Sequence, residues 1–359
     1  MNDFSKKILV WYDRYGRKNL PWQQDINPYR VWVSEIMLQQ TQVKTVIPYF
    51  NKFMAAFPDV QALANAEQDA VLKHWSGLGY YARARNMHKA AKLVCDEFAG
   101  QFPSDIETMQ TLSGVGRSTA AAILSIANNQ KQAILDGNVK RVISRVFAIE
   151  GWAGKSVVLK KMWEVVEQLV PEKRNADYTQ AIMDLGATVC TRSKPQCEKC
   201  PFKADCLAYQ QQTIENYPGK KPKKSLPERY ALMLIIQDKD KAVFMQKRPP
   251  VGIWGGLWCF PQFKKEADAE EWLQSYFLLN SQEVLSKGET QAQLIHVFSH
   301  FRLTIQPIIL QLDKILNNHL KTPMKERVME TDDSLWYNIE TEFNGGLASP
   351  VQTLLNKLK

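Results

Sequence analysis

The chain has 359 residues, of which 45% are hydrophobic and 23% charged. This length favours two domains over one, and the balance of apolar and charged residues excludes a disordered chain. Lys and Arg number 46 against 37 Asp and Glu, which gives a formal net charge of +9. A basic surplus suits an anionic partner, with nucleic acid as the first choice and a membrane surface as the second.

No segment predicts membrane insertion or secretion. No stretch approaches the roughly 18 unbroken apolar residues that a membrane helix needs. The N-terminal sequence MNDFSKKILVWYDRYGRK lacks the apolar region and small residues of a signal peptide. We therefore expect a cytoplasmic protein, in which the six cysteines do not pair as disulfides. Cys95 and Cys259 are isolated among apolar residues and are expected to fill space.

The composition divides the chain into three parts. Residues 1–208 predict a helical domain, because apolar residues recur at helical spacing between Pro and Gly breaks. Residues 209–229 are polar, rich in Pro and Lys, and predict a basic linker. Residues 230–359 predict an α+β domain. Its expected elements are a hairpin in RYALMLIIQDKDKAVFMQKRP, a helix in AEEWLQSYFL, a strand in HVFSHFRLTIQPIIL and a final helix in SPVQTLLNKLK.

An acid lies on the apolar face of the helix predicted over residues 28–43, which Pro28 can begin. Val31, Glu35 and Leu38 share that face at spacings of four and three residues. Burial disfavours a charged carboxylate, so we expect the pKa of Glu35 to be raised and its proton to be held near neutral pH. A structural Glu paired with an Arg, or one at the edge of the apolar stripe, is the alternative.

A second acid, Asp136, follows an apolar pair in ILDGNVKRVISRV, where Asp-Gly-Asn turns into a helix predicted from Val139. Asp and Asn are ordinary N-cap residues, so a structural cap is the alternative to a catalytic role. A catalytic role requires Asp136 to face Glu35 across a cleft, which spacing alone does not establish.

Gly114 and Gly116 precede a helix of small residues in TLSGVGRSTAAAIL. Two glycines allow a sharp turn and leave backbone N–H groups at a helix N-terminus, where a phosphate can bind. A plain corner between two helices is the alternative. Residues 108–125 resemble a helix-hairpin-helix that binds the DNA backbone without reading sequence, and Arg117 and Lys140 can add positive charge.

Four cysteines lie close together, with one C-x-x-C and two flanking thiols: Cys190, Cys197, Cys200 and Cys206. Four thiolates suit either tetrahedral zinc or a [4Fe–4S] cluster, and the spacing leaves both open. Lysines between the thiols would present positive charge outward.

Together these segments resemble the iron–sulfur branch of the helix-hairpin-helix DNA glycosylases, and within it the MutY-type adenine DNA glycosylases. The matching segments follow the family's order: SEIMLQQTQV at 34–43, GLGYYARARN at 77–86, GVGRSTAAAIL at 114–124, LDGNVKRV at 135–142, the four cysteines, and HVFSHFRL at 296–303. The resemblance implies a mostly α catalytic domain that carries one [4Fe–4S] cluster on the four cysteines, followed by an α+β Nudix-like domain.

The resemblance also distinguishes two kinds of glycosylase. The endonuclease III-type enzymes carry a Schiff-base lysine in the hairpin and Asp-Thr-His further along. This chain has Ser118 in place of that lysine and Asp-Gly-Asn at 136–138, which implies a monofunctional glycosylase. It also has Ser113 where the family commonly has Pro, and we expect no loss of function from that change.

The resemblance assigns further residues by their positions in the family's motifs. The expected DNA-binding residues are Gln40, Tyr80, Arg83, Gly114, Gly116, Arg117, Ser118 and Lys140. Gln40 and Tyr80 are those expected to insert into the duplex near the lesion. The expected pocket for the excised base is formed by Trp22, Gln23 and Gln180. The residues expected to recognise 8-oxoguanine are Thr41, Leu78, His296, Phe298, Ser299 and His300.

The implied reaction is hydrolysis of the N-glycosidic bond of an adenine that has left the base stack. Glu35 is expected to protonate the departing adenine. Ionised Asp136 is expected to stabilise the cationic sugar or to capture it briefly in a covalent bond, and the sequence leaves both open. The expected substrate is double-stranded DNA with A:8-oxoguanine or A:G mispairs, bound by a nucleoid-associated monomer. Replication or mismatch-repair proteins are the expected protein partners.

Three other functions are considered. A bifunctional glycosylase/lyase is disfavoured by the absence of Lys at 118, and a non-catalytic DNA-binding metalloprotein by the pairing of Glu35 with Asp136. A nucleotide pyrophosphohydrolase would need the R-E-x-x-E-E metal helix of Nudix enzymes. The segment KKEADAEEWLQSYF lacks that spacing, so we expect a Nudix shape without pyrophosphatase chemistry.

Overall fold

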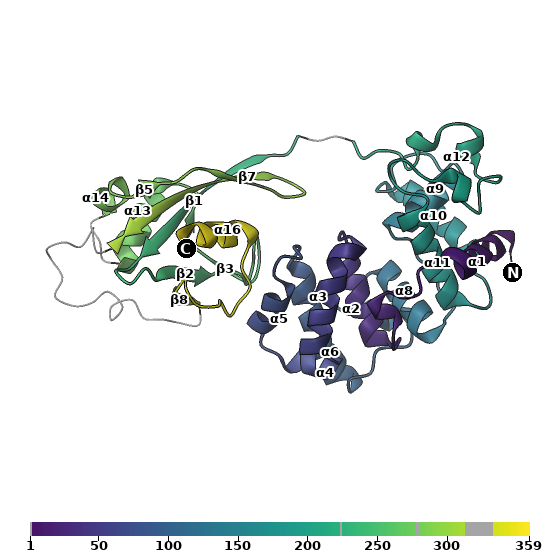
Figure 1. The fold of residues 1–359 in the computed structure, drawn as a ribbon, viewed down its shortest axis with the longest axis horizontal. Coiled ribbons are helices and arrows are strands. Elements are labelled where there is room, and N and C mark those ends of the chain that lie inside the picture. The colour runs from purple at the N-terminus through teal and green to yellow at the C-terminus, as the bar shows by residue number, and fades with distance from the viewer. Residues whose placement is uncertain (1, 223–224, 278–280, 313–332) are drawn as a thin grey trace. The chain divides into compact units, whose positions relative to one another are not determined.

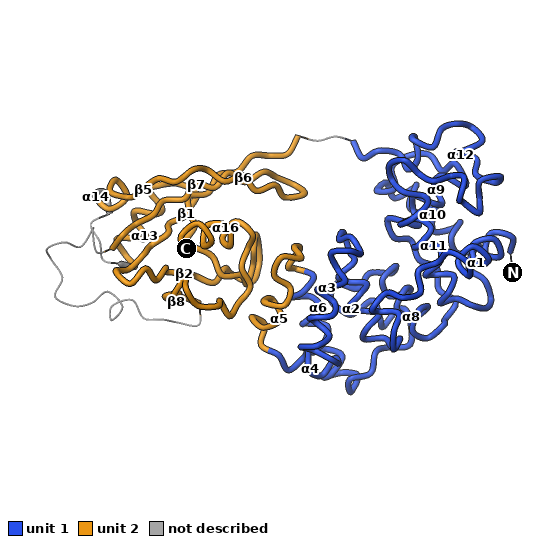
Figure 2. Tube along the Cα trace, in the orientation of Figure 1, with its two compact units in different colours: residues 1–66, 83–223 blue, residues 67–82, 224–359 orange. Residues whose placement is uncertain are grey.

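The structure is a computed structural model that describes residues 2–222, 225–277, 281–312 and 333–359. The chain forms two compact units (Figure 2). Unit 1 contains residues 1–66 and 83–223, and unit 2 contains residues 67–82 and 224–359. Within the described ranges, no helix is both long enough and apolar enough to cross a membrane. The last residue of the helix expected over 269–278 lies outside the described residues.

Every regular element described in unit 1 is helical (Figure 1). These elements are α1 (Asp3–Tyr15), η1 (Pro21–Gln23), α2 (Pro28–Leu38), α3 (Val43–Ala56), α4 (Val60–Asn65), α6 (Ala82–Phe98), whose first residue is in unit 2, α7 (Ile106–Met109), α8 (Arg117–Asn128), α9 (Gly137–Val146), α10 (Ser156–Leu169), α11 (Asn175–Thr188), η2 (Cys197–Lys199), α12 (Leu207–Gln210) and η3 (Ile214–Asn216). The helical prediction for this region is confirmed.

The helix expected over residues 28–43 is shorter than predicted. Pro28 begins α2, as expected, and the side chain of Asn27 caps the helix by accepting the Arg30 N–H at 3.0 Å. The helix ends at Leu38 because Gln40 adopts a left-handed backbone with φ +58, which cannot continue a right-handed helix. The sequence gives no Gly or Pro signal for this turn.

Residues 67–82 pack with the C-terminal part of the chain, so the two units do not follow the sequence boundary expected after residue 208. This segment contains α5 (Gln68–Trp75). The Asp69 carboxylate accepts hydrogen bonds from Lys247 Nζ at 3.0 Å and from Trp258 Nε1 at 3.2 Å. The Tyr81 hydroxyl donates to the Leu347 carbonyl at 2.8 Å. A segment of the helical sequence therefore belongs to the spatial unit of the sheet.

Unit 2 is built on a mixed sheet with the strand path β3-β2-β1-β7-β5, to which β4, β6 and β8 add at β1, β7 and β2. The strands are β1 (Glu228–Gln237), β2 (Val243–Lys247), β3 (Trp258–Cys259), β4 (Gln262–Phe263), β5 (Glu289–Thr290), β6 (Leu294–Val297), β7 (Arg302–Gln311) and β8 (Ser334–Tyr337). The helices of the C-terminal segment are α13 (Glu266–Phe277), α14 (Ser281–Ser286) and α16 (Ser349–Leu358). β1 and β7 run parallel over ten residue pairs, from Glu228–Arg302 to Gln237–Gln311.

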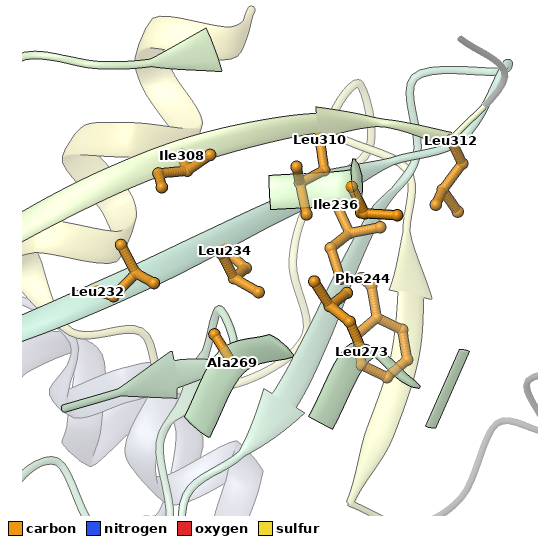
Figure 3. Packing of buried hydrophobic residues seen from close by; sticks show 10 residues of the cluster. Leu232, Leu234, Ile236, Phe244, Ala269, Leu273, Ile308, Leu310 and Leu312 are labelled. Carbon is orange, nitrogen blue, oxygen red and sulfur yellow. The ribbon is translucent and has the colours of Figure 1, made fainter. Parts of the chain in front are cut away.

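The hydrophobic core of unit 2 lies between the central strands and α13 (Figure 3). Leu234 and Ile236 from β1, Leu310 from β7, Phe244 from β2 and Leu273 from α13 are all buried there. β1 is buried without interruption from Ala231 to Gln237, which suits a strand covered on both faces. This core holds β1 and β7 together, and β7 begins directly after the β6–β7 turn.

The structure confirms most of the predicted elements of this domain and corrects one. β1 and β2 form the expected hairpin, with Gln237 opposite Val243, and α13 and α16 are the two expected helices. The prediction of one strand in HVFSHFRLTIQPIIL is wrong: β6 and β7 are antiparallel strands joined by a turn. The turn is closed by the N–H of Phe298, which donates to the carbonyl of Phe301 at 2.9 Å.

Candidate active site

Glu35 and Asp136 line one cavity in unit 1, with a volume of about 740 Å³. Glu35 comes from the last turn of α2, and Asp136 is the residue that precedes α9. The cavity is also lined by α8 and α11, which contribute Ser118 and Gln180. The cavity thus brings together the two acids that the sequence places a hundred residues apart.

Asp136 serves as an N-cap and also faces the cavity. Its Oδ1 accepts the N–H of Val139 at 2.7 Å, and its Oδ2 accepts Nδ2 of Asn138 at 3.2 Å. The two alternatives raised by the sequence, a cap and an acid opposite Glu35, are therefore both features of this residue. The cap fixes the carboxylate against the positive end of a helix, which favours the ionised form.

The two acids have unequal affinities for a proton. Burial, with a smaller contribution from the charge of Asp136, raises the pKa of Glu35 to about 8. Burial also raises the pKa of Asp136, but the hydrogen bonds from Val139 and Asn138 and the charge of Arg141 oppose this shift. These groups stabilise the ionised form of Asp136, and Glu35 has no comparable partners among the groups that set its pKa. Asp136 therefore loses its proton first. Between the two steps the pair holds one proton on Glu35 and one charge on Asp136.

Asn138 and Arg141 connect Asp136 to the four-cysteine loop. Neither residue was predicted to belong to the site. The Asn138 Oδ1 accepts Nη2 of Arg141 at 2.9 Å, and Nε of Arg141 donates to the carbonyl of Cys190 at 2.7 Å. Gly186 of α11 lies against Asn138, where an added Cβ would come within 2.6 Å of the Asn138 Cβ. A helix with glycine at this place can approach the beginning of α9 closely.

The glycine hairpin precedes α8, as predicted. Gly114 has φ +83, a conformation that favours glycine, and Gly116 is the N-cap of α8. Ser118 Oγ accepts the N–H of Leu135 at 3.0 Å, which ties α8 to the segment leading into Asp136. Lys140 is half-buried in the first turn of α9.

Arg117 is the first residue of α8 and is already bound within the protein. Its guanidinium lies 3.9 Å from the ring centroid of Trp163 and forms an ion pair with Glu167, both on α10. All three groups are thus arranged beside the hairpin, and an incoming phosphate would compete with Glu167 for the Arg117 charge.

Arg83, one of the residues predicted to bind DNA, directs its side chain into the protein. Arg83 is only 9% exposed, because its guanidinium points inward to carbonyls at the end of α2. Gln40 and Thr41 lie in the turn beyond that helix end, where Gln40 is exposed and Thr41 lines the cavity. In this structure the Arg83 guanidinium binds protein backbone, and its contact with DNA stays a prediction.

Gln23 contacts Gln180, which lines the cavity, and their role as a pocket for the excised base stays a prediction. Gln23 Nε2 donates to Gln180 Oε1 at 3.4 Å and to the Arg17 carbonyl at 2.9 Å. Trp22 and Gln180 line the cavity, together with Arg17 and Asp184, an ion pair that the sequence analysis missed. Asp184 is 2% exposed and accepts the Arg17 N–H at 2.7 Å, so the pair joins the N-terminal segment to α11.

The four cysteines line one small apolar cavity. Within the described residues, no group of three or more His, Cys, Asp or Glu side chains is arranged to hold a single metal ion. Nη1 of Arg145 lies 3.4 Å from Sγ of Cys190. Four thiols around one cavity, with a buried cation beside them, fit an iron–sulfur cluster, whose thiolates carry negative charge.

The residues expected to recognise 8-oxoguanine lie partly in unit 2. His296 and Phe298 flank the ring of Trp254, with centroid distances of 5.7 and 5.6 Å, and Trp254 was missed by the sequence analysis. Ser299 and His300 are exposed in the β6–β7 turn.

Leu78 and Tyr80 lie in the segment 67–82 of unit 2. The Leu78 side chain is 5% exposed, whereas Tyr80 is 49% exposed. The recognition of 8-oxoguanine by Leu78 stays a prediction. Of the residues of this unit that are expected to act at the lesion, Tyr80 and the two residues of the β6–β7 turn, Ser299 and His300, are therefore exposed to solvent.

Comparison with known proteins gives two family matches along the chain. Residues 33–168 match the HhH-GPD superfamily base excision DNA repair protein family, and residues 232–357 match the NUDIX domain. Adenine DNA glycosylase of Buchnera aphidicola subsp. Acyrthosiphon pisum is 39% identical, over 99% of this chain and 97% of the relative. Adenine DNA glycosylase of Mus musculus is 35% identical, over 87% of this chain and 71% of the relative.

A solved structure is similar to the helical part of the chain. The structure of a thermostable thymine-DNA glycosylase superposes with a TM-score of 0.53 at 29% sequence identity. The superposition covers 58% of this chain and 95% of that chain. The fold around Glu35 and Asp136 is therefore shared with a DNA glycosylase of known structure.

Proposed function

The chain belongs to the adenine DNA glycosylase family, and from that membership we propose that it excises adenine from mispaired DNA by hydrolysing the N-glycosidic bond. The observation that carries this proposal is the unequal pair of acids in one cavity. Glu35, with its pKa raised to about 8, is a proton donor at neutral pH, and Asp136 is the charged partner.

Each acid has a separate task in the reaction. Adenine leaves poorly as an anion, so Glu35 gives its proton to a ring nitrogen and the base departs neutral. The sugar gains positive charge as the C1′–N bond breaks, and ionised Asp136 stabilises that charge. Water then attacks C1′, loses a proton and leaves an abasic site.

The adenine must leave the helix before Glu35 can reach it. Flipping is easiest at a mispair, which supplies part of the selectivity. By their places in the family's motifs, Gln40 and Tyr80 insert into the duplex, and both are exposed here. Trp22, Gln23 and Gln180 receive the base in the cavity that contains Glu35.

DNA is held through its backbone and is not read by sequence. Gly114, Gly116 and the first N–H groups of α8 form the phosphate site, which Arg117 and Ser118 of the first turn of α8 adjoin. Lys140, in the first turn of α9, adds positive charge. A backbone site of this kind predicts affinity that falls steeply as salt rises.

The base opposite adenine in the proposed substrate is 8-oxoguanine or guanine. The proposed contacts are Thr41 in unit 1 and His296, Phe298, Ser299 and His300 in unit 2. The rings of Trp254, His296 and Phe298 pack against one another at tilted or edge-on angles and keep the turn compact, and the exposed Ser299 and His300 side chains offer hydrogen bonds. We accordingly assign lesion recognition to the domain that follows the basic linker.

Cys190, Cys197, Cys200 and Cys206 are proposed to hold one [4Fe–4S] cluster. The cluster would shape the loop between the thiols, whose lysines can then face phosphates, and it takes no part in base release. The buried Arg145 supports this loop by donating to the Thr191 carbonyl at 2.7 Å. A visible absorption band and iron by elemental analysis are expected, whereas a colourless protein that contains zinc would contradict the proposal.

The glycosylase is proposed to be monofunctional, because Ser118 occupies the hairpin position of the Schiff-base lysine and its hydroxyl accepts a backbone N–H. Borohydride should therefore trap no covalent complex with adenine-mispair DNA or with a thymine-glycol duplex. Trapping at either substrate would assign a lyase function instead.

The central experiment measures adenine release under single-turnover conditions from duplexes with A:8-oxoguanine, A:G and A:T pairs. We expect release from the first two and none from A:T. Glu35→Gln should bind A:8-oxoguanine duplex normally and release no adenine, while Glu97→Gln, a change at an exposed acid of α6, should leave the rate unaltered. Full activity of Glu35→Gln would reject the assignment of the acid.

A further inference from the structure

We propose that Arg83 is a positioning residue, which holds the turn of residues 39–41 in the shape that base extrusion requires. The inference rests on the proposed function, because it assigns Arg83 to the insertion of Gln40 into the duplex. In this role Arg83 contacts Gln39 and Thr41, on either side of Gln40, and does not itself need to touch DNA.

Arg83 binds four acceptors at the end of α2 and in the following turn. Its Nη1 donates to the carbonyls of Ile36 at 2.8 Å, Met37 at 2.8 Å and Gln39 at 2.6 Å. Its Nη2 donates to Oγ1 of Thr41 at 3.2 Å. The side chain comes from α6, so one guanidinium joins that helix to the C-terminus of α2 and to both neighbours of Gln40.

The chemistry of the acceptors explains why this position suits arginine. The last carbonyls of a helix have no partner within the helix and carry partial negative charge. A planar guanidinium can serve several such oxygens in a fixed direction, whereas the ammonium of lysine is a flexible point charge. The buried charge of Arg83 is therefore stabilised by the same backbone carbonyl oxygens whose positions it fixes.

The backbone conformation of Gln40 has to be stabilised by contacts from outside the turn. It has φ +58, a left-handed conformation that costs free energy for a residue with a Cβ. Arg83 binds Gln39 on one side of it and Thr41 on the other. With these anchors lost, the turn can relax to right-handed conformations, and the exposed Gln40 side chain would point elsewhere.

Glu35 provides a way to separate positioning from chemistry. Glu35 lies in α2, the helix whose end Arg83 binds. Its raised pKa results from burial and from the charge of Asp136, and Arg83 is not among the groups that shift this pKa. Loosening the turn should thus impair extrusion of the base while leaving the pH at which Glu35 loses its proton unchanged.

The test compares Arg83→Lys with Arg14→Lys, the same substitution at an exposed residue of α1. Single-turnover adenine release is measured from an A:8-oxoguanine duplex and from a duplex with adenine opposite a stable abasic analogue, where extrusion costs less. Arg83→Lys should slow release from the mispair by about tenfold or more and from the second duplex by about twofold or less. Its alkaline pH limit should match that of the unsubstituted protein.

A double substitution adds a second criterion. If Arg83 acts through Gln40, then Arg83→Lys should slow release no further in a Gln40→Ala background. Equal slowing on both duplexes, a multiplicative effect in the double variant, or a rate equal to that of Arg14→Lys would each overturn the inference.

Hydrogen–deuterium exchange at the backbone amides of 39–42 keeps the inference testable without activity. Exchange should be faster in Arg83→Lys than in Arg14→Lys, and unchanged exchange would overturn the proposal. If Arg83→Lys does not fold, Thr41→Val removes only one acceptor and should raise exchange in the same amides, with Thr41→Ser as its control. Absence of adenine release from the unsubstituted protein would instead refute the proposed function, and exchange would still decide the role of Arg83.

Discussion

Asn138 donates its side-chain amide to Oδ2 of Asp136 at 3.2 Å and accepts Nη2 of Arg141 on its own oxygen at 2.9 Å. The amide is therefore oriented by both partners, with its donor toward the carboxylate. Because Arg141 also donates to the Cys190 carbonyl, the orientation of the Asp136 carboxylate depends on the placement of the four-cysteine loop. A hydrogen bond to the ionised form of an acid lowers its pKa, and this bond opposes the effect of burial on Asp136.

Asn138→Ala should raise the pKa of Asp136, since it removes one of the groups that favour the carboxylate. A smaller fraction of the protein then carries the required charge, so adenine release should slow, and the acidic limb of the pH–rate profile should move to higher pH. The profile is measured under single-turnover conditions, together with DNA affinity, which should stay the same. An unshifted acidic limb would contradict the assigned role of this hydrogen bond.

Glu35→Gln should stabilise the protein in a pH-dependent way. The folded pKa of Glu35, about 8, exceeds its ordinary value of 4.5, so the folded state binds more protons than the unfolded state between these values. Its contribution to stability is complete below about pH 4.5 and is lost as pH rises toward 8. Glutamine has no proton to lose, so the variant should gain about 2–4 kcal/mol over the unsubstituted protein at pH 8 and almost nothing at pH 4.5. Urea unfolding across this range measures the difference, and parallel stability curves would contradict it.

Glu167→Gln should tighten duplex binding, because Glu167 competes with DNA phosphates for the charge of Arg117. We expect a gain of about two- to fivefold at low salt, which shrinks as salt rises. Fluorescence anisotropy titrations at several salt concentrations measure it. Glu164→Gln removes the same charge from an exposed position one turn earlier on α10 and is the matched control. Equal gains for both variants would assign the effect to net charge alone.

Arg145→Gln should destabilise unit 1 by roughly 2–4 kcal/mol, because it leaves buried carbonyls without donors. Arg145 is 4% exposed and donates to the carbonyls of Thr191, Arg192 and Tyr217. Thermal unfolding should show the loss, and iron content should fall with it if these carbonyls shape the cluster loop. Arg14→Gln, at an exposed arginine, is the control. Unchanged stability would mean that the loop is held by other contacts.

The two acids could be found in the sequence, but their relationship could not. Glu35 is conspicuous as a carboxyl on an apolar helix face, and Asp136 as a cap before an amphipathic helix. Their meeting in one cavity depends on how α2, α8, α9 and α11 pack, which local periodicity does not encode. The helical character of unit 1 and the hairpin and helices of unit 2 follow from local patterns and were predicted.

The arginines show why the rest was missed. Arg83, Arg141 and Arg145 look like surface charges in the sequence, yet each is directed to carbonyl groups that are distant along the chain. Similarly, the turn at Gln40 and the turn at Ser299–His300 contain no Gly or Pro, so periodicity extended a helix through the first and a strand through the second. Tertiary contacts overrode local preference at both places.

The grouping of residues 67–82 with the sheet has a practical consequence for dissecting this protein. A fragment that stops at residue 223 would keep Asp69, Lys73 and Tyr81 but lose the groups they bind: Lys247 and Trp258, Glu342, and the Leu347 carbonyl. Tyr80 lies in that same stretch, so such a truncation would disturb a residue proposed to enter the duplex. Measurements on the isolated N-terminal fragment would therefore mix the loss of lesion recognition with damage to the extrusion apparatus itself.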